Sequence, residues 1–123
     1  MRLVRDRAVL LIDDDDDLRE AMGDLLDLFG ARCLGLPSVA ALVDSESAAL
    51  DCRLAILDVN LGDGQPSGVE AFEWLRAHDF PGRIVFLTGH AASHPAVARA
   101  ASLGVRVLAK PIESAELRAL LEA

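Results

Sequence analysis

Five short apolar segments alternate along the chain with segments of helical periodicity. Residues 8–12 are continuously apolar, and so are residues 54–59 apart from Asp58, which is typical of a strand buried on both faces of a parallel sheet. The apolar segments are residues 8–12, 32–36, 54–59, 83–88 and 105–109. The helical segments that follow them are residues 18–29, 38–50, 69–78, 94–104 and 114–123. Each strand leads into a helix through a connection of a few residues, and this alternation requires a parallel sheet. Right-handed crossovers place helices on both faces, so the sequence predicts a doubly wound α/β fold.

Polar residues and glycines mark several of the expected helix ends. Asp17 followed by Glu20 resembles a capping box at the start of the first helix, and Gly30 is placed to end that helix. Ser38 is the expected N-cap of the second helix, and Gly104 closes the fourth.

Length and charge limit the classes of protein to which the chain can belong. With 123 residues, of which 52% are hydrophobic, the chain is long enough for one domain with a proper core and too short for two. We therefore expect residues 1–123 to form a single domain. A net charge of −8 argues against a general nucleic-acid-binding surface, which needs a basic face, and against binding to anionic membranes.

The chain carries no signal for membrane insertion or secretion. No apolar run approaches the length of about 18 residues that a transmembrane span needs, and residues 1–9 hold charges but no apolar signal-peptide core. Cys33 and Cys52 are far apart with no CxxC spacing, so we expect buried free thiols. The histidines lack the paired spacing of zinc ligands. These features predict a cytoplasmic protein.

The carboxyl ends of the expected strands carry most of the chemically reactive groups. In parallel sheets of this kind, functional groups gather at that edge. The residues concerned are Asp13 and Asp14 after the first strand, Asp58 and Asn60 at the third, Thr88 at the fourth and Lys110 at the fifth. The predicted topology therefore brings three carboxylates, a hydroxyl and an ammonium to one rim.

Five consecutive aspartates, residues 13–17, directly follow the first apolar segment. Like charges about 5 Å apart repel by about 3 kcal/mol per pair at an effective dielectric constant near 20, so a plain turn would not need them. We expect Asp13 and Asp14 to face a metal ion. Asp15, Asp16 and Asp17 are expected at the start of the helix, where acidic groups favour the helix dipole.

Four segments resemble the receiver domain of bacterial two-component response regulators, the family of the chemotaxis response regulator. They are LLIDDDDDLREAM (10–22), LAILDVNL (54–61), IVFLTGHA (84–91) and VLAKPI (107–112). The resemblance covers residues 8–123 and has the four motifs in order at the strand ends. It implies a flavodoxin-like five-stranded parallel sheet of order 2-1-3-4-5 with five helices on both faces, and a cis peptide bond between Lys110 and Pro111.

The residues at the rim also indicate phosphoryl chemistry by themselves. Asp58 is the expected phosphoacceptor, which would carry the phosphoryl group as an aspartyl phosphate. A carboxylate attacks an anionic phosphoryl group poorly unless charge is neutralised. Mg²⁺ (or Mn²⁺) suits this task, because it accepts few carboxylates, several waters and phosphate oxygens. We expect Thr88 to donate its hydroxyl to a phosphoryl oxygen, and Lys110 to pair with Asp58 or with the phosphate.

The expected metal ligands come from the first and third strands. Asp14 would bind the ion directly and Asp13 through a water. Asp58 would supply one carboxylate oxygen, and Asn60 its backbone carbonyl. Without metal, three carboxylates face one ammonium, so the excess of negative charge favours a cation.

Three features depart from the family pattern. The loop at residues 60–68 is longer than the usual loop beside the phosphoacceptor. Val107 stands where the family often has a Tyr or Phe that moves on phosphorylation, and Ile112 stands where Phe is common, so aromatic coupling to output is not implied.

His90 lies two residues beyond Thr88, near the path of the water that attacks the phosphoryl group in the family. We expect His90 to modulate the phosphoryl lifetime; the alternative is a solvated loop histidine.

Two other classes of protein share part of this pattern. The spacing Asp13-x-Asp15-x-Asp17 resembles a calcium-binding EF-hand loop, but Leu18 replaces its required Gly and Asp24 its terminal Glu. A hydrolase of the haloacid dehalogenase type would also use an aspartyl phosphate and Mg²⁺. It would place the nucleophile in the first strand and need a longer chain, and turnover of a small phosphate ester would reveal it.

The sequence therefore predicts a cytoplasmic phosphoacceptor receiver domain of a two-component phosphorelay. It would accept phosphate from a phosphohistidine on a sensor histidine kinase or a histidine phosphotransfer protein. It would signal to a downstream protein target by conformational change, without direct contact to nucleic acid or membrane. It would assist its own phosphorylation and dephosphorylation without independent turnover, so it is not expected to be an enzyme. The alternative is a receiver severed from a larger transcription factor or hybrid histidine kinase.

Overall fold

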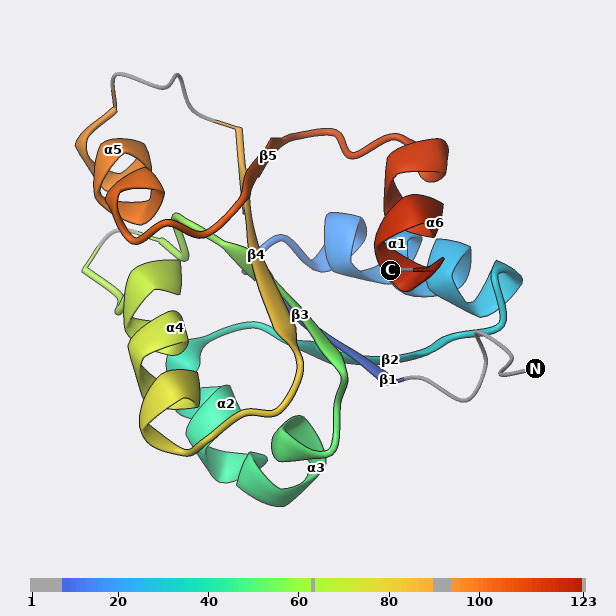
Figure 1. The fold of residues 1–123 in the computed structure, drawn as a ribbon, viewed down its shortest axis with the longest axis horizontal. Coiled ribbons are helices and arrows are strands. Elements are labelled where there is room, and N and C mark those ends of the chain that lie inside the picture. Colours follow the sequence, from blue (N-terminus) through green and yellow to red (C-terminus); the bar gives the residue numbers. More distant parts are fainter. Residues whose placement is uncertain (1–7, 63, 90–93, 123) are drawn as a thin grey trace.

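A five-stranded parallel sheet forms the centre of the molecule (Figure 1). The computed structural model describes residues 8–62, 64–89 and 94–122. The strands in this part of the chain are β1 (Ala8–Ile12), β2 (Arg32–Leu36), β3 (Leu54–Asp58), β4 (Arg83–Thr88) and β5 (Val107–Ala109). They are ordered β2-β1-β3-β4-β5, and all neighbours pair in parallel. The predicted strand order and the flavodoxin-like fold class are confirmed.

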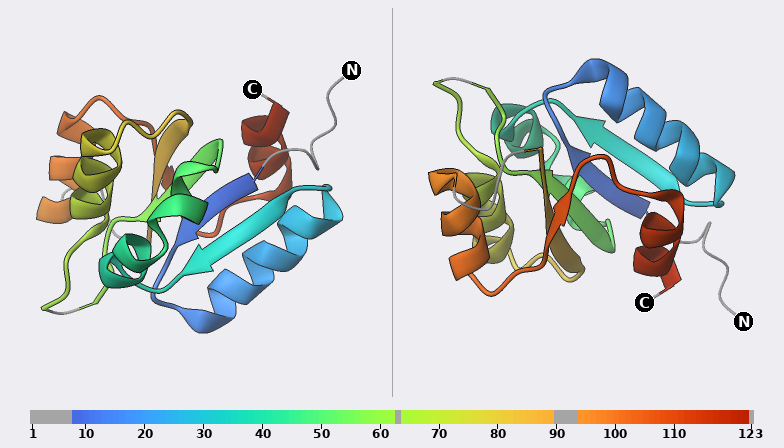
Figure 2. Two further views of the ribbon diagram at one scale, coloured as in Figure 1. Left: turned by 90° about the horizontal axis from the view of Figure 1, so that it is seen from below. Right: turned by 90° about the horizontal axis from the view of Figure 1, so that it is seen from above.

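Helices cover both faces of the sheet (Figure 2). One face carries α1 (Asp16–Leu28) and α6 (Ser114–Glu122). The other face carries α2 (Val39–Asp44), α3 (Glu46–Leu50), α4 (Gly68–Ala77) and α5 (Pro95–Ser102). The sheet is therefore enclosed between two layers of helices, as the doubly wound topology requires.

Strand β1 contributes to the core on both sides of the sheet. Val9 and Leu11 pack with Leu26 of α1 on one face, whereas Leu10 and Ile12 join the core on the other face. These four side chains are completely buried. Each contributes about 1.5–3 kcal/mol of hydrophobic stabilisation. A strand in this position must be apolar at successive residues, which explains the continuous apolar segment in the sequence.

The first helix begins earlier than the sequence pattern suggested. Its N-cap is Asp15, whose carboxylate accepts a hydrogen bond from the N–H of Leu18 at 3.1 Å. The prediction that Asp17 caps this helix is therefore wrong. The reason is a local turn: Asp13 Oδ1 accepts the N–H of Asp15 at 2.9 Å, and this turn leaves Asp15 in an extended conformation from which the helix starts.

The segment 38–50 forms two short helices rather than the one predicted. Ser38 caps α2 as expected, because its side chain accepts a hydrogen bond from the N–H of Ala41 at 3.1 Å. Ser45 then interrupts the helix with φ −111° and ψ 27°, and its N–H donates to Leu42 O, a bond that tightens the last turn. The described residues thus hold six helices where five were expected, and the fold class is unchanged.

Glycines act at three helix ends. Gly30 and Gly104 follow α1 and α5 with φ of 82° and 74°, a conformation that other residues avoid, so both predicted helix ends are confirmed. Gly68 begins α4 for a different reason. A Cβ at Gly68 would overlap the carbonyl oxygen of Asp58, and its N–H donates to Val59 O at 3.0 Å. Only glycine allows α4 to approach the end of β3 so closely.

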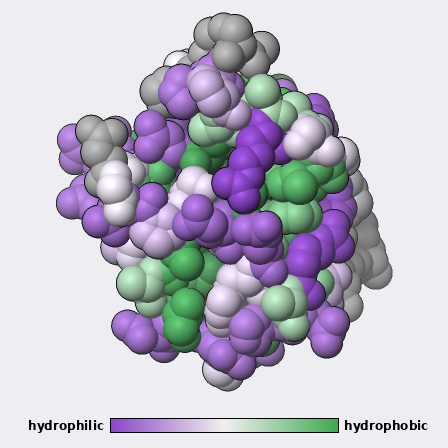
Figure 3. All heavy atoms as spheres, turned by 90° about the vertical axis from the view of Figure 1, so that its left-hand side faces the viewer, coloured by the Kyte–Doolittle hydropathy of each residue, from purple (hydrophilic) through white to green (hydrophobic). Residues whose placement is uncertain are grey.

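The surface on the side of α4 and α5 mixes hydrophobic and hydrophilic side chains (Figure 3). Leu103, just beyond α5, is one of three exposed large hydrophobic residues in the described part of the chain, with Val43 and Leu28. Leu28, at the end of α1, is the most exposed of them, at 77%. Within the described residues, no helix has both the length and the apolar character that a membrane crossing needs.

Both cysteines are free thiols, as expected. Cys52 is buried as expected, but Cys33 is only half-buried, so the prediction of a buried thiol is wrong for Cys33. Burial raises the pKa of the Cys52 thiol to about 11, and its Sγ donates to Ala48 O at 3.5 Å. Cys52 is therefore a protonated core side chain at neutral pH.

Candidate functional site

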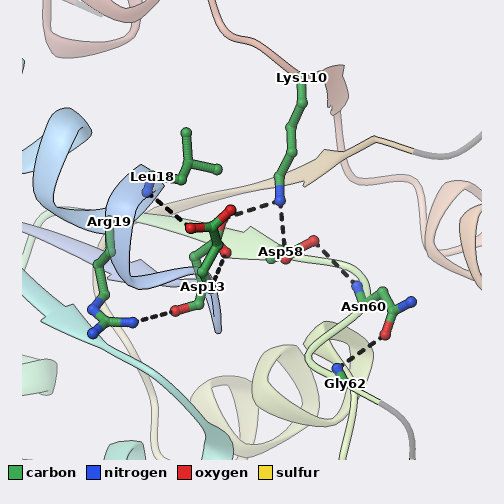
Figure 4. A network of polar contacts seen from close by, with 8 residues as sticks. Asp13, Leu18, Arg19, Asp58, Asn60, Gly62 and Lys110 are labelled. Atoms are coloured by element: carbon green, nitrogen blue, oxygen red, sulfur yellow. Dashed lines mark hydrogen bonds and ion pairs between the residues drawn. The ribbon is translucent and has the colours of Figure 1, made fainter.

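The carboxyl edge of the sheet brings together residues that are far apart in the sequence (Figure 4). Asp13 follows β1, Asp58 ends β3 and Lys110 follows β5. Because β1 and β3 are adjacent, their terminal aspartates meet. One carboxylate oxygen from each of Asp13, Asp14 and Asp58 lies within 4.8 Å of the other two. The structure thus has the acidic cluster at the rim where the topology predicted it.

An open cavity of about 350 Å³ lies at this edge. Its walls are formed by Asp14, Asp15, Asp58, Asn60, Gly62, Gly89 and Lys110. Four of these residues were candidate site residues, whereas Asp15, Gly62 and Gly89 were not. The two glycines add no side chain to the wall of this cavity.

Asp13 is completely buried and held from several directions. Its N–H donates to Leu36 O at 3.1 Å, which extends the pairing of β1 with β2 by one residue. Its Oδ1 accepts the N–H of Asp15 at 2.9 Å. Lys110 Nζ lies 3.1 Å from Oδ2 as an ion pair, but Oδ2 receives no aligned hydrogen bond from the described residues. This oxygen therefore retains capacity to interact with a cation.

Asp58 is buried, with 4% of its surface exposed. Its Oδ2 accepts a hydrogen bond from Lys110 Nζ at 3.0 Å, and its Oδ1 accepts one from the N–H of Asn60 at 3.2 Å. Burial, and then the charge of Asp13, raise the pKa of Asp58 from 3.8 to about 6, although Lys110 and Asn60 act in the opposite direction. In the metal-free protein, this carboxylate is thus ionised less easily than an ordinary aspartate.

Lys110 is the only lysine of the chain and points from the end of β5 toward the two aspartates (Figure 4). Burial alone would lower its pKa, but the hydrogen bond to Asp58 and the negative charges of Asp58 and Asp13 outweigh burial and raise the pKa above 10.5. The backbone N–H of Lys110 donates to Thr88 O at 2.8 Å, which aligns Lys110 with the end of β4. The Lys110–Pro111 peptide bond is cis, as the family resemblance implies.

The loop after β3 folds against the acidic edge. Asn60 Oδ1 accepts the N–H of Gly62 at 3.0 Å, and Leu61 between them is buried in the core. Gly62 has φ 111°, and a Cβ there would lie 3.6 Å from Asp14 Oδ2. Although this loop is long, these contacts keep Asn60 beside Asp58. The Asn-x-Gly pattern indicates such a turn, which was not among the predictions from the sequence.

The other candidate residues lie at different distances from the cavity. Thr88 ends β4 and is buried, at 6% exposure. Val107 lies in β5, where it is paired with Phe86 and packs at the edge of the core. It does not line the cavity. His90 lies outside the described residues, so its predicted role is not placed by the structure.

This set of donors fits a divalent cation. Carboxylate oxygens are the ligands that Mg²⁺, Mn²⁺ and Ca²⁺ prefer. Three carboxylates converge while a single ammonium opposes them, and one buried oxygen of Asp13 lacks an aligned donor. Burial and, after it, repulsion from Asp13 raise the pKa of Asp58, and a cation would relieve that repulsion.

Known proteins resemble this chain over most of its length. The family model described as the response regulator receiver domain matches residues 9–122. The chain is 31% identical over 115 residues to the photosynthetic apparatus regulatory protein RegA of Rhodobacter capsulatus, covering 91% of this chain and 59% of RegA. It is 32% identical over 116 residues to the transcriptional regulatory protein FixJ of Azorhizobium caulinodans, covering 94% of this chain and 53% of FixJ. The chain thus spans less than two thirds of these relatives.

Solved structures show the same fold. A response regulator receiver domain from Clostridium thermocellum has a TM-score of 0.80 at 20% identity, covering 94% of this chain and 91% of that one. A response regulator from Burkholderia pseudomallei, solved with a phosphorylated aspartic acid, a calcium ion and citrate, has a TM-score of 0.76 at 24% identity. That match covers 94% of this chain and 66% of the other.

Proposed function

The chain belongs to the response regulator receiver domain family, and we propose that it accepts a phosphoryl group on Asp58 and signals by a change of conformation. The observation that supports this most strongly is the position of Asp58. It is a carboxylate at the end of a central strand, beside two further aspartates and hydrogen-bonded to the only lysine. It also lines the open cavity, where a phosphoryl donor can reach it.

The proposed reaction is transfer of a phosphoryl group from a phosphohistidine. A carboxylate oxygen of Asp58 forms a bond to phosphorus while the bond from phosphorus to the imidazole nitrogen breaks, and the leaving imidazole keeps the electron pair. Lys110 Nζ, now 3.0 Å from Asp58 Oδ2, would turn to the phosphoryl oxygens. Thr88 would donate its hydroxyl to another of these oxygens.

The acidic cluster is proposed to hold Mg²⁺ or Mn²⁺. Asp14 and Asp58 would bind it with carboxylate oxygens, Asn60 with its backbone carbonyl, and Asp13 through a water. When bound, the ion supplies the neutralisation of charge that lets an anionic carboxylate meet an anionic phosphoryl group. The choice of a small divalent ion follows from the few carboxylates available.

We propose a signalling module rather than an enzyme with independent turnover. The phosphoryl donor would be a sensor histidine kinase or a histidine phosphotransfer protein. The signal would pass to a downstream protein in the cytoplasm. Residues 1–123 are proposed to fold as a single receiver domain. Val107 stands where the family often has an aromatic residue. We therefore propose that no aromatic side chain at this position couples phosphorylation to output.

A second possibility is that the domain regulates a longer protein. RegA and FixJ are named as regulatory proteins, and the chain covers only 59% and 53% of their lengths. The receiver would then control an attached output domain, such as that of a transcription factor or a hybrid histidine kinase. The chemistry at Asp58 would be the same in both cases.

The test is phosphorylation with acetyl phosphate in the presence of Mg²⁺ or EDTA, followed by intact-protein mass spectrometry. We expect one phosphoryl group per chain in Mg²⁺ and none in EDTA. Asp58→Asn should remain unlabelled, whereas Asp51→Asn should behave as wild type, because Asp51 is an exposed carboxylate at the opposite edge of the sheet. Labelling of Asp58→Asn at the wild-type level would disprove the assignment. Sustained turnover of small phosphate esters would favour a hydrolase.

A further inference from the structure

Arg19 of α1 reaches back across the end of β1 (Figure 4). Its Nη1 donates a hydrogen bond to the backbone carbonyl of Asp13 at 2.7 Å. Its Nη2 donates to Asp16 Oδ1 at 2.6 Å. The Arg19 side chain is only 20% exposed, whereas that of Asp16 is 85% exposed. The bond to Asp13 is therefore the more sheltered of the two, and nothing in the sequence pattern pointed to it.

The carbonyl that Arg19 binds belongs to the peptide unit joining Asp13 to Asp14. On the other side of Asp13, the chain is already held, because the N–H of Asp13 donates to Leu36 O. A peptide unit is planar, so a hydrogen bond to its oxygen fixes the orientation of the whole unit. The bond from Arg19 thus restrains the peptide unit that leads to Asp14, a residue of the cavity wall.

Gly35 of β2 provides the space through which the Arg19 side chain passes. A Cβ at Gly35 would lie 3.0 Å from Arg19 Cγ and 3.2 Å from Arg19 Cδ, closer than ordinary van der Waals contact. The φ of Gly35 does not lie in the left-handed region, so its backbone does not itself require glycine. A side chain at this position would press against the Arg19 stem, so the Arg19 side chain would have to shift.

We propose that Arg19 is a positioning residue for the divalent cation site. This inference rests on the proposed function, since it takes the acidic cluster to be a cation site. Among the described residues, Arg19 contacts no candidate ligand atom. It would act through the backbone carbonyl of Asp13. Residues that orient metal ligands in this way typically change metal affinity about 10–100-fold when they are replaced.

Positioning and simple electrostatics predict opposite signs for this residue. A guanidinium beside a cation site repels the cation, so removing its charge would strengthen binding if charge alone mattered. If Arg19 positions Asp14, removing it must weaken binding, because the ligand loses its fixed orientation. The direction of the change therefore separates the two roles.

The experiment is a Mg²⁺ titration by calorimetry of wild type, Arg19→Gln and Arg19→Lys. We expect Arg19→Gln to bind Mg²⁺ roughly tenfold more weakly than wild type. Arg19→Lys keeps one donor for the Asp13 carbonyl and should recover part of that loss. Arg99→Gln is the matched control: it also removes one positive charge, but from an exposed ion pair with Glu73 at 3.8 Å between α5 and α4. Its affinity should stay within twofold of wild type.

A second variant tests the same contact without changing charge. Gly35→Val should displace the Arg19 stem and weaken Mg²⁺ binding in the same direction as Arg19→Gln. Circular dichroism and melting in EDTA establish that each variant is folded. If wild type binds Mg²⁺ and Arg19→Gln binds it equally or more tightly, the positioning role is overturned. If wild type itself shows no Mg²⁺ binding, the proposed cation site fails, and this inference fails with it.

Discussion

Lys110 Nζ donates a hydrogen bond to Asp58 Oδ2 at 3.0 Å, joining two residues that are 52 positions apart in the chain. The same ammonium lies 3.1 Å from Asp13 Oδ2. One positive charge thus stands between two buried carboxylates. In the absence of a cation, it is the main group that compensates them, so its removal affects both stability and metal binding.

Replacing Lys110 by Met should have two opposite effects. In EDTA at pH 7, the free energy of unfolding should fall by about 1–3 kcal/mol, because the buried carboxylates lose their charged partner. The affinity for Mg²⁺ should rise, since the ammonium no longer competes for the same oxygens. Urea unfolding in EDTA and Mg²⁺ calorimetry measure the two quantities. Weaker Mg²⁺ binding by Lys110→Met would contradict the proposed arrangement. Arg106→Gln, which breaks an exposed ion pair with Glu116, serves as control.

The metal-free protein should become less stable as pH rises, because Asp58 loses its proton in the folded state. Its pKa is raised from 3.8 to about 6, so between these values the folded state holds a proton that the unfolded state releases. The stabilisation from this group is complete below about pH 4 and is lost as pH rises through about 6. The loss amounts to at most about 3 kcal/mol.

The measurement for Asp58 is the free energy of unfolding in EDTA, for wild type and Asp58→Asn, from about pH 4 to about pH 7. The variant cannot titrate at this position, so the difference between the two proteins isolates the carboxylate. Wild type should lose stability relative to the variant across this range. A difference that stays constant or changes in the other direction would count against the raised pKa. Added Mg²⁺ should stabilise wild type increasingly as pH rises, because the cation binds ionised carboxylates.

Gly68 should not tolerate a side chain. A Cβ there would overlap the carbonyl oxygen of Asp58 and lie 3.1 Å from Val59 Cα, which are backbone atoms that cannot rotate away. We expect Gly68→Ala to lower the free energy of unfolding by about 1–3 kcal/mol and to reduce phosphorylation of the displaced Asp58. Gly23→Ala is the contrasting control. It lies inside α1 with no atom within 4 Å of a Cβ, and should stabilise the protein by about 0.5–1 kcal/mol.

His90 should set the lifetime of the phosphorylated protein. We expect His90→Ala to change the dephosphorylation rate at least severalfold, because the imidazole either orients the attacking water or, when charged, holds the phosphoryl oxygens. The measurement is the decay of phosphorylated protein in Mg²⁺ at about pH 5.5 and about pH 8, between which histidine changes its charge. His78→Ala, at the end of α4, is the control. Identical decay of wild type and His90→Ala at both pH values would reject this role.

The strands, most of the helices and the convergence of the acidic residues at one edge could be predicted from the sequence. Burial on both faces of a sheet requires continuous apolar segments, and burial of one helix face requires apolar residues at helical spacing. Short connections then leave few topologies, and parallel strands place Asp13, Asp58 and Lys110 at one edge. These features depend on neighbours in the sequence or on the general geometry of sheets, so local patterns were sufficient.

The tertiary structure decided how these groups interact. The pKa of Asp58 depends on its burial and on its distance from Asp13 and Lys110. The contact of Arg19 with the Asp13 carbonyl depends on the space above Gly35. The sequence by itself determined which groups share the edge of the sheet. Their charges, orientations and supporting contacts were decided only by folding, because Coulomb energies and hydrogen bonds change over distances of about an ångström, which periodicity does not encode.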